Sequence, residues 1–471
     1  MHEDWRTFSN DPSHLDLVRR FEEMVANGDR LFFDVEELEV LVDYYLDRRE
    51  IRRARFVLDY ANKLFPENLG MRLREAHVLA ASGQHVRAIP LLKSILQVEP
   101  DNEEAHLNLG SIYSQMQEHR LAIQHFQQAL QTADEEMRRD LHLDIALEFE
   151  NMGDWRQAIR HLRASLEEDP ENETALYELA FCYERTAQFE EATRFFEAFL
   201  NERPYSFGAW YSLGNIHQLN NRFESAVEAY ELAIAIEDSF GPAYLQKAEA
   251  LMSLDKHEAA LDTFHEVLER EPASAPTLCF MGECLERMED WDKARAYYLE
   301  CLALDPDWAD AEVGLGVIAD ALGDLKTAAR HFQRAVDLQP ETIDYLLLLA
   351  SILKKLGEHD RAEAELLKAL KWEPNHPDVW LERVDNALVA AQPDKALAIA
   401  DTALHNDSAA VNELQARRMV AFYGLGRDAE AFTLLESLLV SDPETVMTIV
   451  ETFPALANDA RFTERLTRFK N

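Results

Sequence analysis

The residues of this chain best suited to bind a metal or act as a nucleophile are its cysteines and histidines. There are 16 histidines and four cysteines, Cys182, Cys279, Cys284 and Cys301. Cys279 and Cys284 lie five residues apart, so a helix would not direct both thiolates at one metal, which requires i, i+4 spacing. The histidines are scattered, and no nucleophile, base and orienting residue occur together. We expect no catalytic residue, no metal site and no cofactor.

Two glycine-containing stretches match a loose dinucleotide-binding pattern, G-x-G-x-x-A. They are GLGVIA at residues 314–319 and GLGRDA at residues 424–429. Such a loop must follow a strand and open a helix within a βαβ unit, and neither stretch follows a predicted strand. The sequence also lacks G-x4-G-K-[ST], H-E-x-x-H and C-x2-C. These patterns together predict that the protein is not an enzyme.

The composition is typical of an acidic helical protein. Gly (15) and Pro (16) are scarce in 471 residues, while Ala, Leu and Glu are plentiful. The 88 acidic and 47 basic side chains give a formal charge of −41, which repels nucleic acid and anionic membranes. We expect no nucleic-acid partner. The charge fits a protein or peptide partner with basic character, although an acidic surface also serves solubility.

The chain carries no visible targeting or membrane segment. Its beginning, MHEDWRTFSNDPSHLD, has no basic stretch followed by an apolar one. The longest apolar run, residues 345–353, is far shorter than the roughly 20 residues that span a bilayer. Four cysteines in so long a chain do not indicate a disulfide framework. We expect a cytoplasmic protein without membrane insertion.

A period of about 34 residues organises the sequence. Apart from a two-residue insertion near residues 134–138, eight prolines stand one period or a multiple of it apart: Pro66, Pro100, Pro170, Pro204, Pro272, Pro306, Pro340 and Pro374. Counted from Val35 in the first unit, position 8 is mostly small, position 20 is nearly always alanine, and position 24 is large and apolar. Small side chains let two antiparallel helices approach, and proline ends the second helix. The period therefore predicts helix-turn-helix units of two roughly 14-residue helices.

The segment WYSLGNIH at residues 210–217, followed by Ala226, Tyr230 and Ala233, resembles the tetratricopeptide repeat (TPR) consensus. This resemblance implies an all-α fold, a right-handed α-α superhelix (TPR solenoid) of about twelve helix-turn-helix repeats with terminal capping helices. The repeats would start near residues 35, 69, 103, 139, 173, 207, 241, 275, 309, 343, 377 and 411. Residues 1–34 and 446–471 would form caps around the array at 35–445. Asp11 and Pro12 would begin the first cap, and Phe462, Leu466 and Phe469 would share a face in the second, with Arg461 and Arg465 pointing outward.

The resemblance also implies that the first helices of successive units line a concave groove that holds peptides. Its inward positions combine aromatic and hydrogen-bonding side chains most densely in units five and six. The candidate binding residues there are Tyr177, Phe181, Arg185, Tyr211, Asn215 and Gln218, of which the last three are not required by the core pattern. The lysine of the two-carboxylate clamp that some TPR co-chaperones use is absent from position five.

Three functions fit these features. The first is a protein-interaction scaffold that binds peptide or protein segments in the groove. The second is a substrate-recruiting or regulatory subunit of an enzyme, secretion or assembly complex. The third is a self-assembling spacer in which the basic ends, residues 48–55 (RREIRRAR) and Arg461, Arg465, Arg468 and Lys470, meet the acidic middle of another copy. The oligomeric state stays open.

Overall fold

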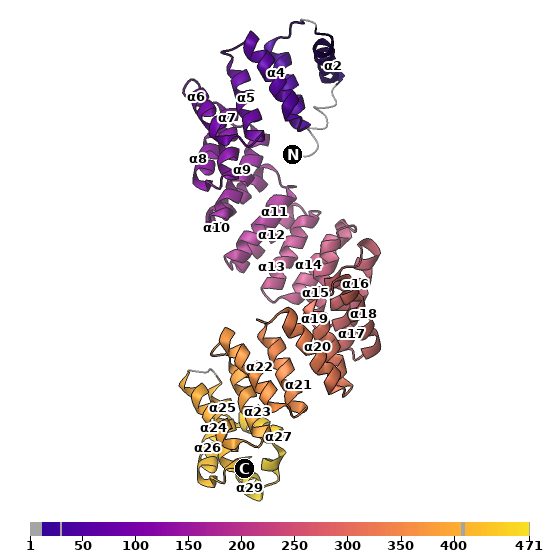
Figure 1. Cartoon of the computed structure of the whole chain (residues 1–471), viewed down its shortest axis with the longest axis vertical. Coiled ribbons are helices and arrows are strands. Elements are labelled where there is room, and N and C mark those ends of the chain that lie inside the picture. The colour runs from indigo at the N-terminus through magenta and orange to yellow at the C-terminus, as the bar shows by residue number, and fades with distance from the viewer. Residues whose placement is uncertain (1–11, 29–30, 407–409, 471) are drawn as a thin grey trace. The chain divides into compact units, whose positions relative to one another are not determined.

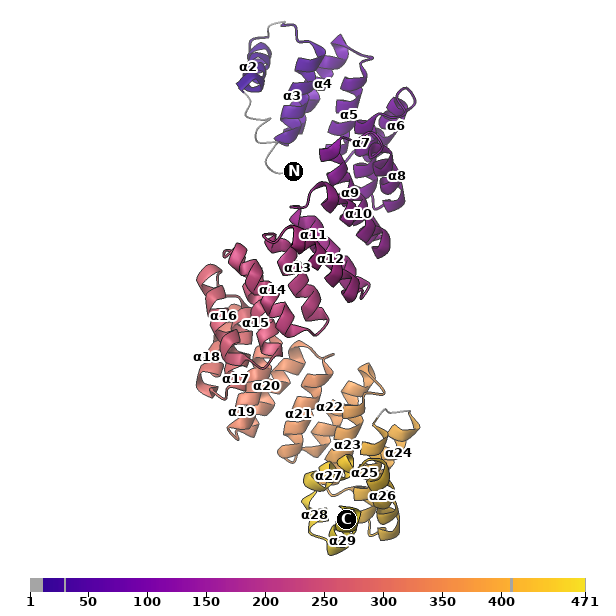
Figure 2. The same cartoon turned by 180° about the vertical axis from the view of Figure 1, so that it is seen from behind.

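The described residues fold into helices and contain no strand. The computed structural model describes residues 12–28, 31–406 and 410–470 (Figure 1, and from behind in Figure 2). The chain divides into two compact units, Met1–Gln246 and Lys247–Asn471. Each unit is described by itself below.

Helices follow one another with short connections, and from α2 to α26 they have 11 to 17 residues, most of them 13 or 14. The first unit contains α2 (Pro12–Asn27), α3 (Val35–Asp47), α4 (Ile51–Leu64), α5 (Leu69–Ala81), α6 (His85–Leu96), α7 (Glu103–Gln115), α8 (His119–Ala129), α9 (Glu135–Asn151), α10 (Trp155–Glu168), α11 (Glu173–Arg185), α12 (Phe189–Glu202), α13 (Phe207–Leu219) and α14 (Phe223–Ile236). The unit boundary falls within α15 (Gly241–Ser253). The second unit continues with α16 (His257–Arg270), α17 (Ala275–Arg287), α18 (Trp291–Leu304), α19 (Ala309–Ala321), α20 (Leu325–Leu338), α21 (Ile343–Lys355), α22 (His359–Trp372), α23 (Pro377–Val389), α24 (Pro393–His405), α25 (Val411–Gly424), α26 (Asp428–Ser441), α27 (Pro443–Thr452) and two terminal helices, α28 (Pro454–Ala457) and α29 (Ala460–Lys470).

A residue in the left-handed conformation marks the turn between the two helices of each pair. These residues, all with φ between 51° and 79°, are Arg49, Gly83, Gln117, Gly153, Ala187, Asn221, Asp255, Glu289, Gly323, Gly357, Ala391 and Gly426. They recur with the period of the prolines, except for slightly longer steps from Gln117 to Gly153 and from Ala391 to Gly426. The period predicted from the prolines is thus also the period at which the backbone adopts the left-handed conformation. The fold class is confirmed as an all-α helical repeat solenoid.

Glycine at position 8 makes room for the ring at position 24 of the same pair. A Cβ on Gly214 would lie 2.4 Å from the ring of Tyr230, and one on Gly316 would lie 2.5 Å from the ring of Phe332. Real Cβ atoms do not approach so closely, so the two helices can meet at this distance only without a side chain. The glycines of the GLGVIA stretch therefore serve packing, since Gly314 likewise has the ring of Tyr298 against it.

Repeated polar contacts fix where the first helix of a pair begins. Asn68, Asn102, Asn172, Ser206 and Ser274 each accept a hydrogen bond from the backbone N–H three residues later, which caps the helix. The residue at position 4 of the first helix then hydrogen-bonds to the proline that ends the preceding helix pair. The indole N–H groups of Trp210 and Trp380 donate to the carbonyl oxygens of Pro204 and Pro374, both at 2.9 Å.

The two ends of the chain pack as helices, with one departure from expectation. Phe462 is fully buried against Tyr423 and Phe432, with ring centroids 5.1 Å and 5.0 Å apart. Arg461 is exposed, as expected, and pairs with Asp428 and Asp459 at the surface. Arg465 differs from the expectation, because it is only partly exposed and its guanidinium lies 3.9 Å from the Phe432 ring centroid. Asp11 and the side chains of Pro12, Arg468, Phe469 and Lys470 lie outside the described residues. The predicted partition at 34/35 and 445/446 stays a prediction.

Candidate functional site

The six candidate residues lie on two first helices that pack directly against each other, α11 and α13. The rings of Tyr177 and Tyr211 are perpendicular, with centroids 5.8 Å apart. Tyr211 also contacts Phe240, whose ring lies 5.1 Å away at 88°. We call Tyr177, Tyr211 and Phe240 the aromatic ladder. All three are partly exposed, and sequence reasoning missed Phe240 because it precedes α15 and lies outside the helical pattern.

Phe181 and Arg185 of α11 form a second cluster with Trp155 of α10. The Phe181 ring meets Trp155 edge to face, with centroids 5.9 Å apart, and the Arg185 guanidinium lies 5.4 Å from the Trp155 ring centroid. Phe181 is 42% exposed. Trp155 opens the second helix α10, a place that carries no groove signal in the sequence, so it too was missed. The structure therefore places Tyr177 and Tyr211 in one cluster and Phe181 and Arg185 in another.

Asn215 and Gln218 are more firmly engaged than the sequence pattern indicates. The Tyr230 hydroxyl lies 2.8 Å from Asn215 Oδ1 and 3.0 Å from Gln218 Oε1, and Gln218 donates to Gln246 Oε1 at 3.3 Å. Tyr230 is itself a buried core residue. The interpretation that the core does not require these two amides is wrong.

An acidic cavity adjoins the aromatic ladder at the start of α11 and α13. It has a volume of about 710 Å³, and its charged lining residues are Asp169, Glu171, Glu173, Glu202 and Arg203. Tyr205 in its wall is 83% exposed. Burial, reinforced by the Glu173 carboxylate, raises the pKa of the Tyr177 hydroxyl, so this group stays a neutral donor. The acidic stretch EEDPENE at residues 167–173 thus contributes to the wall of this cavity.

A half-buried carboxyl group of α9 contacts α11. The Cys182 thiol on α11 donates to Glu150 Oε1 on α9 at 3.4 Å. Burial, with a smaller contribution from Glu178, raises the pKa of Glu150 to about 7. This side chain therefore changes charge near neutral pH.

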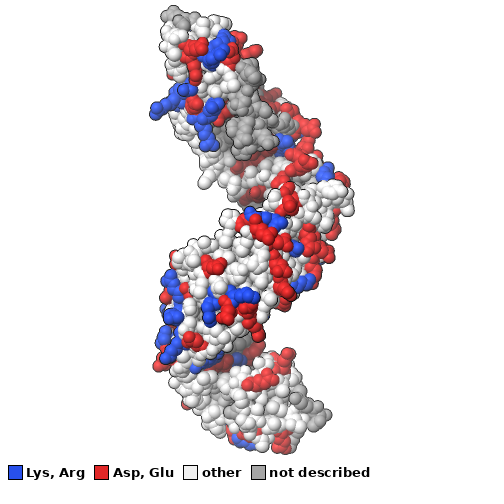
Figure 3. All heavy atoms as spheres, turned by 90° about the vertical axis from the view of Figure 1, so that its right-hand side faces the viewer, with Lys and Arg blue, Asp and Glu red and all other residues white. Residues whose placement is uncertain are grey.

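Figure 3 shows acidic side chains spread over one face of the molecule, with fewer basic ones among them.

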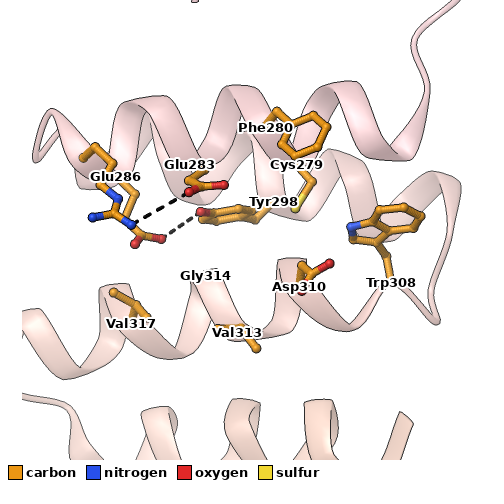
Figure 4. A pocket seen from close by; sticks show the side chains of 11 residues that line it. Cys279, Phe280, Glu283, Glu286, Tyr298, Trp308, Asp310, Val313, Gly314 and Val317 are labelled. Carbon is orange, nitrogen blue, oxygen red and sulfur yellow. Dashed lines mark hydrogen bonds and ion pairs between the residues drawn. The ribbon is translucent and has the colours of Figure 1, made fainter. Parts of the chain in front are cut away.

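The second unit contains a smaller cavity of about 330 Å³ between α17, α18 and α19 (Figure 4). Cys279, Glu283, Glu286 and Arg287 of α17 line it together with Tyr298 and Trp308. The Tyr298 hydroxyl donates to Glu286 Oε2 at 2.7 Å, and burial raises the pKa of Glu286. All these polar groups lie on first-helix positions or against them, as the repeat pattern predicts.

The four cysteine thiols are buried. Burial raises the pKa of Cys284 to about 12 and of Cys301 to about 11, so these thiols are neutral and poor nucleophiles. Over the residues that the structure describes, no three His, Cys, Asp or Glu side chains are arranged to hold a metal ion. In the same part of the chain, no helix is long and apolar enough to span a bilayer.

Helix pairs repeating at a fixed period, with candidate binding residues on the first helices, define this chain as a helical-repeat interaction protein. Models described as tetratricopeptide repeat match residues 79–141, 152–215 and 319–380, and others with the same description match 207–240, 242–274 and 273–341. Together they cover more than half of the sequence. The chain belongs to the tetratricopeptide repeat family. Such repeats typically act as non-catalytic scaffolds for protein–protein interaction, and this chain is a scaffold in that general sense.

The chain is also similar to solved structures. The structure of the APC/C hetero-tetramer Cut9–Hcn1 has 14% identity and a TM-score of 0.42, with 90% of this chain and 98% of that chain covered. A tetratricopeptide repeat protein from Parabacteroides merdae has 15% identity and a TM-score of 0.41, with 60% and 99% covered. MamA has 18% identity and a TM-score of 0.32, with 36% and 92% covered. No curated protein matches the sequence.

Proposed function

We propose that the chain is a scaffold that binds an extended, basic segment of a partner protein along the wall formed by α11 and α13. The observation that carries this proposal is the aromatic ladder beside an acidic cavity. Partly exposed tyrosine and phenylalanine rings bury much area at little cost in side-chain entropy, so they dominate binding energy at interfaces.

Charge favours a basic occupant. Four carboxylates and one guanidinium line the cavity next to Tyr177. Asp169 and Glu202 pair with Arg139 and Arg203. A lysine or arginine in the segment would pair with the exposed Glu171 and Glu173, and its stem would cover the rings. The basic ends offer less support for the self-assembling spacer, because Arg53 pairs with Glu22 at 2.7 Å and Arg461 pairs within its own unit.

Selection of peptides from a displayed random library on the full chain tests this function. The selected peptides should be enriched in lysine and arginine. Combining Tyr177→Ala, Phe181→Ala and Tyr211→Ala should weaken the best peptide at least about a hundredfold, since each anchor contributes more than about 1 kcal/mol. Circular dichroism should report unchanged helix content.

Trp372→Ala is the matched control, because Trp372 is a 52% exposed aromatic residue on the second helix α22. It should leave the peptide affinity unchanged. Peptides without basic enrichment, or a triple variant with full affinity, would contradict the proposal.

A further inference from the structure

A second cavity in the first unit opens between the second helices α12 and α14, with α13 as its floor. Its volume is about 720 Å³. The floor residues are Trp210, Leu213 and His217, and the walls include Leu200, Glu197, Arg222, Ser225, Glu228 and Ala229. Trp210, Leu213 and His217 share one face of α13 by helical spacing, and Tyr211, Asn215 and Gln218 share another. The cavity is therefore distinct from the wall assigned above. We call it the outer pocket.

The outer pocket exists because two rings found in earlier repeats are replaced. In the pair α7–α8 the ring of Tyr113 at position 11 stacks on His125 at position 23, with centroids 5.6 Å apart. In α9–α10 the ring of Phe149 stacks on His161 in the same way, at 5.7 Å. The equivalent residues of α13–α14 are His217 and Ala229. The shorter imidazole therefore has no ring to stack on.

In the preceding repeat, the guanidinium group of an arginine of the chain occupies the position that corresponds to the outer pocket. There Arg163 at position 25 of one pair lies over Phe195 of the next, 5.0 Å from the ring centroid, and pairs with Glu191 at 3.6 Å. One repeat later, the residue equivalent to Arg163 is Glu197. The outer pocket has thus lost a guanidinium and gained a carboxylate.

His217, which lines the pocket, has a buried polar atom without a partner. It is 8% exposed, and its Nδ1 finds no hydrogen-bond partner within the described residues. Burial lowers the pKa of His217, with a smaller contribution from Arg222, so the ring is neutral. A neutral imidazole ring in the pocket leaves its face free of positive charge, so it does not repel a cationic ligand.

The charges around His217 are predominantly negative. Glu197 and Glu228 line the pocket, while the guanidinium of Arg222 pairs with Glu190 at 2.6 Å. Trp210 is held in place by its hydrogen bond to Pro204. A rigid ring, a neutral imidazole and two carboxylates therefore surround one cavity.

We infer that the outer pocket binds an arginine side chain of a partner protein. A planar guanidinium can lie against the face of the His217 imidazole that lines the pocket and pair with Glu197 and Glu228. Arg163 and Phe195 place a guanidinium on a ring at the equivalent position one repeat earlier. In the second unit, Arg383 lies over Trp380 at 4.8 Å and pairs with Glu363 at 2.7 Å. The combination of ring, carboxylate and guanidinium therefore recurs within the chain itself.

Nuclear magnetic resonance of the full chain with ¹³C-labelled histidine tests this inference. The probe is N-acetyl-L-arginine methylamide, and the His217 signal is assigned by its loss in His217→Tyr. The probe should shift that signal saturably. The uncharged citrulline analogue should bind at least about tenfold more weakly, because it lacks the charge-assisted hydrogen bonds.

Ala229→His is the decisive variant, since it copies His161 and should restore the stacked ring without disturbing the fold. It should abolish the shift while circular dichroism stays unchanged. Tyr211→Ala should leave the shift intact, which separates this pocket from the α11–α13 wall. The inference is overturned if no probe binds, if the citrulline, lysine or phenylalanine analogue binds as tightly as arginine, or if Ala229→His binds like the native chain.

Discussion

The phenol oxygen of Tyr230 lies 2.8 Å from Oδ1 of Asn215, so a core residue of α14 holds an amide on the candidate wall of α13. The same hydroxyl lies 3.0 Å from Gln218 Oε1. Because the Tyr230 ring also rests on Gly214, the packing of one helix pair orients the polar groups offered to a partner. If the proposed wall binds a partner, affinity and stability should therefore both depend on this contact.

Replacing Tyr230 by phenylalanine should separate these two roles. Phenylalanine is the native residue at the equivalent Phe126, Phe196 and Phe332, so the ring should still fit. Loss of the hydroxyl should cost about 1 kcal/mol of unfolding free energy and should weaken the selected peptide. Urea unfolding and calorimetric titration measure the two effects. A variant with native stability and native affinity would show that the hydrogen bonds are unimportant.

Adding one methyl group at Gly214 should destabilise the first unit. A Cβ there would lie 2.4 Å from the Tyr230 ring, and such overpacking costs about 1–3 kcal/mol. Gly208→Ala is the matched control on the same helix, because its Cβ would meet the nearest atom at an ordinary 3.5 Å. It should be neutral or slightly stabilising, as alanine favours helix. Equal unfolding midpoints for the two variants would contradict the packing argument.

Two histidine pairs should make the first unit sensitive to acid. Nδ1 of His106 lies 2.9 Å from Nδ1 of His125, and His142 and His161 repeat this contact at 2.9 Å. Burial, then the neighbouring histidine, lowers the pKa of His125 and of His161 from 6.5 to about 4. The unfolded chain therefore binds more protons between these values. The stabilisation is complete above pH 6.5 and is lost as pH falls toward 4.

Urea unfolding at about pH 7 and pH 5 measures this loss. The double variant His125→Phe and His161→Phe, which copies Phe195 at the equivalent position, should lose much less stability over that interval. An identical pH dependence in the native chain and the double variant would exclude the histidine pairs as its cause.

The sequence was sufficient to predict the repeat, because the residues that specify each helix pair lie close together in the sequence. Prolines, small residues and rings at fixed spacing specify where helices end and cross, and Gly214 against Tyr230 realises that rule directly. The candidate sites were less predictable because they depend on contacts between repeats. Trp155 reaches Phe181 from α10, and the outer pocket depends on the absence of a ring at Ala229, which is visible only by comparison with His161 and Phe195 in the folded chain.

Left-handed turn residues that are not glycine offer a way to stabilise the array. Ala391 has φ 56° and the equivalent Gly357 has φ 78°, a region that costs an L-residue about 1–2 kcal/mol. Ala391→Gly should therefore raise the unfolding free energy by roughly 0.5–1 kcal/mol, after the greater freedom of glycine in the unfolded chain is subtracted. Gly357→Ala should lower it by a similar amount for conformational reasons alone, because a Cβ there would meet nothing within 4 Å. Urea unfolding midpoints of the two variants should move in opposite directions, and movement in the same direction would contradict the backbone argument.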